Sequence, residues 1–92
     1  MRNRMDVIAD ILYEFLMTLH DFDELDSWET IGSENTADFR VYKVWYINLH
    51  QAERILRIEL DFEKEELSYG VWDLGVNNTV KFDSFIDIAK TK

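Results

Sequence analysis

The chain has 92 residues, of which 19 are acidic and 10 are basic, and it contains no cysteine. The formal net charge of −9 argues against direct binding to nucleic acid, which needs cationic groups to displace counterions from phosphates, and against binding to anionic membranes. With 47% hydrophobic and 14% aromatic residues, the composition is that of one globular domain, residues 1–92. The lack of cysteine excludes disulfides and thiolate sites. No apolar run reaches the length of a membrane span, and acids interrupt the N-terminal apolar run, so we expect a cytoplasmic protein.

The negative charge is concentrated in residues 5–38, which contain ten acids and no lysine or arginine. The remaining residues are nearly neutral, with nine acids against ten bases. A block of like charge costs self-repulsion in a small folded domain, so it points to a functional reason or to good screening. The ten acids are Asp6, Asp10, Glu14, Asp21, Asp23, Glu24, Asp26, Glu29, Glu34 and Asp38.

Residues 4–22 are predicted to form an amphipathic helix. Apolar residues recur at spacings of three and four and so form one stripe: Met5, Ile8, Leu12, Phe15, Leu19 and Phe22. The opposite arc is acidic, with Asp6, Asp10, Glu14 and Asp21, and it also contains Tyr13 and Met17. Aromatic and methionine side chains are enriched at protein interfaces. The arc is therefore a candidate surface for a basic partner, and a solvated helix face is the alternative.

Residues 21–38 are predicted to be an acidic connection: a helix exit, a loop, a short strand near Trp28 to Ile31, and a turn at 32–35. Asp23, Glu24, Asp26 and Glu29 surround Trp28 and extend the candidate surface, although Trp28 is equally well explained as a core residue. A calcium-binding loop does not fit, because its sixth position would be Asp26 instead of glycine.

The rest of the chain reads as a meander. Residues 39–50, 54–63 and 67–74 have the alternation and composition of strands, and Gly70 in the third marks a bulge or a close backbone contact. Residues 79–82 form a short fourth strand or start a helix, and a short C-terminal helix is expected from Asp83 onward. We predict an α+β domain with an N-terminal amphipathic helix, a three- to four-stranded antiparallel meander sheet and a short C-terminal helix, both helices on one face.

Strand 39–50 is partly apolar on both faces, which favours an interior position in the sheet. Tyr42 and Tyr46 share one face and could stack bases. The net charge opposes this interpretation, so we expect a helix or a dimer partner to cover them. A second acidic patch at Glu59, Asp61, Glu63, Glu65 and Glu66 is typical of a solvated sheet face.

No motif for catalysis, a metal or a cofactor is recognisable. The two histidines, His20 and His50, are not at ligand spacings, no nucleophile motif frames a serine, and the three glycines form no phosphate loop. We therefore expect a protein that is not an enzyme and uses no cofactor.

In size, in its lack of cysteine and proline, in its helix–meander–helix order and in the acidic block at 5–38, the chain resembles small acidic phage-encoded inhibitors. This class includes anti-CRISPR proteins and other DNA-mimic or anti-defence proteins. The resemblance implies a monomer or homodimer that inhibits a basic protein partner, a nucleic-acid-binding enzyme, without contacting nucleic acid itself. An immunity or antitoxin protein that neutralises a basic toxin would share these features. A structural or regulatory module that homodimerises through residues 39–49 is the third interpretation.

Overall fold

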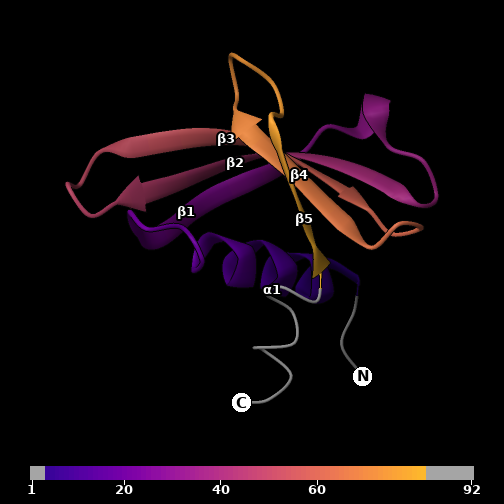
Figure 1. The fold of residues 1–92 in the computed structure, drawn as a ribbon, viewed down its shortest axis with the longest axis horizontal. Helices are drawn as coiled ribbons and strands as arrows, with labels where there is room; N and C mark the ends of the chain where they lie inside the picture. Colours follow the sequence, from indigo (N-terminus) through magenta and orange to yellow (C-terminus); the bar gives the residue numbers. More distant parts are fainter. Residues whose placement is uncertain (1–3, 83–92) are drawn as a thin grey trace.

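A computed structural model describes residues 4–82, with side chains from Ile8 onward. These residues form helix α1 (Arg4–Leu16), strand β1 (Phe22–Thr30), the short 3-10 helix η1 (Gly32–Glu34), and strands β2 (Phe39–Asn48), β3 (Glu53–Asp61), β4 (Glu66–Val71) and β5 (Asn78–Lys81). The strands form one antiparallel sheet in chain order, and α1 lies across one face of it (Figure 1). The α+β class and the N-terminal helix are confirmed, but the sheet has five strands among these residues instead of three or four. The predicted C-terminal helix lies outside the described residues.

The hydrophobic core lies between α1 and the sheet. Burial of one large apolar side chain stabilises the fold by about 1.5–3 kcal/mol. From α1 the buried residues are Ile8, Ile11, Leu12, Phe15 and Leu16, and from the sheet Tyr42, Val44, Tyr46, Leu56, Ile58, Leu60 and Leu67. Tyr42 and Tyr46 thus lie under the helix, as the covered-face interpretation predicted.

Helix α1 is shorter than predicted, because it ends at Leu16 and not at residue 22. The Thr18 hydroxyl donates a 2.6 Å hydrogen bond to the carbonyl of Phe15, and the Leu19 N–H donates to the carbonyl of Leu16 at 3.0 Å. These three-residue bonds tighten the last turn and end the helix. Leu19 and Phe22 still pack against the core, so the apolar stripe continues through a turn into β1.

Strand β1 is the largest departure from the prediction, because most of this acidic segment was expected to be a loop. It pairs with β2 along its whole length at one edge of the sheet, with register shifts between Phe22 and Glu24 and between Leu25 and Ser27. At each shift two residues of β1 oppose one of β2, which is a β-bulge. The side chains that pack toward the core therefore recur every third residue, at Phe22, Leu25 and Trp28.

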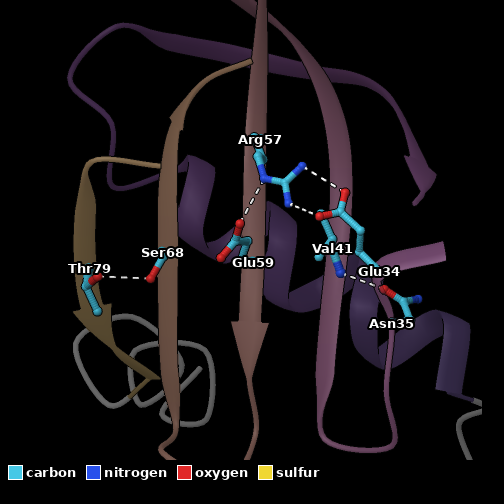
Figure 2. A network of polar contacts seen from close by, with 7 residues as sticks. All are labelled: Glu34, Asn35, Val41, Arg57, Glu59, Ser68 and Thr79. Atoms are coloured by element: carbon cyan, nitrogen blue, oxygen red, sulfur yellow. Dashed lines mark hydrogen bonds and ion pairs between the residues drawn. The ribbon is translucent and has the colours of Figure 1, made fainter. Parts of the chain in front are cut away.

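The face of the sheet opposite α1 carries a polar network. Arg57 on β3 forms ion pairs with Glu34 of η1 at 2.7 Å and with Glu59 at 2.8 Å. The backbone N–H of Val41 donates to the side-chain oxygen of Asn35 at 2.8 Å, so the segment around η1 is fixed to the sheet from two sides (Figure 2). The Arg57 guanidinium also donates a hydrogen bond to the Glu34 carboxylate. This bond lowers the pKa of the Glu34 carboxyl.

Candidate functional site

The predicted helix arc is exposed in the structure. Tyr13 and Met17 have 44% and 46% of their surfaces accessible, Asp10 is exposed, and Glu14 is half-buried. The side chain of Asp6 lies outside the described part of the chain. The Tyr13 ring contacts the ring of Phe22 edge-on, with centroids 5.8 Å apart. Because Phe22 is the first residue of β1, the helix arc and the edge strand meet at this contact.

The acids of β1 lie along the open edge of the sheet. Asp23, Glu24, Asp26 and Glu29 are all exposed, and Glu24 and Glu29 pair with Ile47 and Lys43 of β2. Among the described residues, neither Glu24 nor Glu29 forms an ion pair, and Asp23 accepts a 2.8 Å hydrogen bond from the side-chain amide of Gln51. We call these four acids, together with Asp10, Tyr13, Glu14 and Met17, the acidic surface.

One carboxyl of β3 extends this surface across β2. The pKa of Glu53 is raised, chiefly by a side-chain hydrogen bond with Asp26, then by burial, and then by the negative charge of Asp26. Two carboxyl groups that share a hydrogen bond are stabilised by one proton between them. The raised pKa therefore reflects the closeness of Glu53 on β3 to Asp26 on β1.

Two predicted site residues have packing roles. Asp21 lies beyond the end of α1, and its carboxylate accepts the Tyr46 hydroxyl at 2.9 and 3.2 Å. Burial, and then this hydrogen bond, raise the pKa of Tyr46 to about 12. Trp28 is half-buried on the helix side of the sheet, where its ring meets Tyr42 edge-on with centroids 5.4 Å apart. The interpretation of Trp28 as a core residue fits this packing.

A groove with a volume of about 480 Å³ lies beside the turn that follows α1. Residues from four separate segments line it: His20 and Asp21, Tyr46 on β2, Glu53 to Leu56 on β3, and Val71 to Asp73 at the end of β4. No motif in the sequence indicates this groove, because its walls come together only when the meander pairs β2, β3 and β4.

Comparison of the chain with protein-family models, curated proteins and solved structures finds no match. Within residues 4–82, no helix has both the length and the apolar character needed to cross a membrane. The described side chains include no group of three or more histidines and acids placed to hold a metal ion. The acidic surface and the groove are the two features of the described residues that suit the binding of a partner.

Proposed function

We propose that this protein is a non-enzymatic binding protein that inhibits a basic, nucleic-acid-handling partner by charge complementarity, as anti-CRISPR and other anti-defence proteins do. The observation that carries the proposal is the contact between Tyr13 and Phe22, which joins the helix arc to the acidic edge strand. Rows of exposed acids steer a basic partner into encounter, and exposed aromatic and methionine side chains supply contact area within them.

A partner protein, and not nucleic acid, fits this surface because phosphates would be repelled by its carboxylates. An immunity or antitoxin protein bound to a basic toxin would use the same chemistry. A toxin gene beside the gene for this chain would favour that version of the proposal.

Homodimerisation through β2 is the second candidate function. Trp45 and Ile47 on the face opposite α1 are only half-buried, and this face carries no α-helix among the described residues. Sedimentation at high protein concentration decides this case, because a strict monomer would eliminate the dimer.

The test of the main proposal is a double charge reversal on the helix arc, Asp10→Lys with Glu14→Lys. The matched control is Asp38→Lys with Glu63→Lys, two exposed acids outside the acidic surface. The wild-type chain captures its partner from the source cells, the partner is identified and purified, and Kd is measured across a salt series. We expect the helix reversal to weaken binding about tenfold or more and the control to change it about twofold or less.

Salt should weaken wild-type binding steeply, because the attraction between opposite charges is screened. An acidic partner, affinity independent of salt, or equal effects of the two reversals would each refute the proposal.

A further inference from the structure

The groove beside the turn after α1 is lined by both apolar and charged residues. Leu56 and Val71 supply apolar surface, and 52% of the Val71 surface is exposed. The acidic residues Asp21, Glu53 and Asp73 and the basic residue Arg54 also line it. Acidic residues in this lining therefore outnumber Arg54 by three to one.

This combination fits one kind of occupant, a lysine or arginine side chain. Such a side chain buries its apolar stem along hydrophobic surface while its charged end reaches polar groups. An anion would be repelled by the three acidic residues. An uncharged apolar group would remove water from the charged residues and give them no new partner, which costs free energy. The charge and shape of the groove therefore match a basic side chain.

The groove opens beside the acidic surface. Asp21, which lines the groove, immediately precedes β1, and its hydrogen-bond partner Tyr46 also lines the groove and pairs with Leu25 of β1, so the two features are continuous. Exposed ion pairs contribute about 0–1 kcal/mol each, whereas most binding energy at protein interfaces comes from a few side chains seated in pockets. The acidic surface is suited to steering a partner, and the groove is suited to anchoring it.

We propose that this groove binds a lysine or arginine side chain of the partner and anchors it, with the stem on Leu56 and Val71 and the charged end at Asp21 and Asp73. The inference rests on the proposed function, and it adds a specific recognition pocket to that function. Asp21 then has two roles, because the carboxylate that accepts the Tyr46 hydroxyl also faces the bound cation.

The test uses the full-length chain labelled with ¹⁵N and two short peptides, acetyl-Gly-Arg-Gly-amide and the same peptide with citrulline in place of arginine. Citrulline keeps the shape of arginine and removes its charge. We expect the arginine peptide to cause saturable amide shifts at Asp21, Arg54, Leu56 and Asp73, and the citrulline peptide to bind several-fold more weakly. Equal binding of the two peptides, or shifts spread along β1 without saturation, would overturn the inference.

Two charge-removing variants sharpen the test. Asp21→Asn retains an oxygen that can accept the Tyr46 hydroxyl, and Asp73→Asn alters an exposed turn residue. Each should weaken binding of the arginine peptide about two- to fivefold, the size of one partly exposed ion pair, whereas Asp38→Asn should leave it unchanged. Binding unaffected by both groove variants would refute the site.

The two proposals fail separately. If the arginine peptide misses the groove while reversal of Asp10 and Glu14 still weakens partner binding, the groove inference is wrong and the proposed function stands. If the peptide saturates the groove while the captured partner is acidic, the proposed function is wrong and the groove remains a binding site for a basic side chain.

Discussion

Gly70 is the residue whose identity the fold restricts most clearly. It lies in β4 beneath the loop that joins β4 to β5, and a Cβ atom at this position would overlap the backbone carbonyl of Gly75. Gly75 itself has a φ of +79°, a conformation that favours glycine. The close backbone contact predicted as one reason for Gly70 is confirmed, and the loop that it holds in place includes Asp73, which lines the groove.

Replacing Gly70 by alanine should therefore destabilise the protein. Because the atom in the way belongs to the backbone, the loop must move, and we expect Gly70→Ala to lower the free energy of unfolding by about 2 kcal/mol. The matched control is Gly32→Ala, since nothing lies within 4 Å of a Cβ at Gly32; its effect should be about 0.5 kcal/mol or less. Urea denaturation measures both, and equal stability of the two variants would contradict the close approach.

At the scale of elements, the strands with regular alternation were predictable and β1 was not. Leu56, Ile58 and Leu60 alternate with charged residues and all three are buried, as the period of two requires. In β1 the two bulges insert Asp23 and Asp26, so the inward side chains follow a period of three that matches neither a strand nor a helix. Acidic residues also have low strand propensity. Strand β1 therefore forms because it pairs with β2, and a local sequence pattern does not reveal that pairing.

Part of the candidate site was likewise predictable from the sequence, and part was not. The exposure of Tyr13 and Met17 followed from the helical period, because both fall outside the apolar stripe. The role of Asp21 did not, since its partner Tyr46 lies 25 positions away in sequence. The groove depends on strand order as well, and strand order is not visible in the local sequence pattern.

The bulges and acids of β1 also protect an open sheet edge from pairing with another chain. The same acids repel neighbouring carboxylates, and this repulsion can be measured at Glu53, which lies close to Asp26. The pKa of Glu53 is raised above the ordinary 4.5, so the folded state prefers the protonated form. That preference stabilises the fold fully below about pH 4.5 and is lost as the pH rises through the raised pKa.

Glu53→Gln should consequently stabilise the protein at pH 7 and change its stability little near pH 4. At neutral pH the substitution removes one of two neighbouring negative charges, while a neutral amide can still bond to Asp26. Thermal unfolding of wild type and variant between pH 3.5 and pH 7 measures the difference. Glu63→Gln, another exposed glutamate, serves as the control. A Glu53→Gln variant that is less stable than wild type at pH 7 would show that the pair is favourable when ionised.

For the whole molecule, the effect of charge on stability depends on two opposing contributions. Acids repel one another on the acidic surface, and opposite charges and aromatic rings attract cations on the face of the sheet opposite α1. On that face the Lys43 ammonium lies 5.2 Å from the ring centre of Trp45 and 4.8 Å from that of Trp72. Arg57 completes the positive group, with a side chain that is only 19% exposed. These attractive contacts are short and local, whereas the acids of α1 and β1 repel one another over a larger area.

Salt should therefore stabilise the folded protein. The Debye length falls from about 30 Å at 0.01 M salt to about 8 Å at 0.15 M, which screens repulsion between separated exposed acids more than contact between paired, partly buried groups. We expect Tm to rise by a few degrees over this range of NaCl, because the net charge of −9 opposes compaction. Calorimetry at fixed pH provides the measurement.

The variant Glu24→Gln with Glu29→Gln tests the origin of this salt effect. Because it removes two charges from the acidic surface, its Tm should exceed that of wild type at low salt and should rise less on addition of NaCl. The control, Glu63→Gln with Glu65→Gln, removes the same charge from the β3–β4 turn and should retain more of the wild-type salt dependence. If Tm of the wild type fell with salt instead, the ion pairs of Arg57 would outweigh the repulsion. Repulsion among the acids of α1 and β1 would then cost the fold little, and their charge would no longer require a basic partner as its explanation.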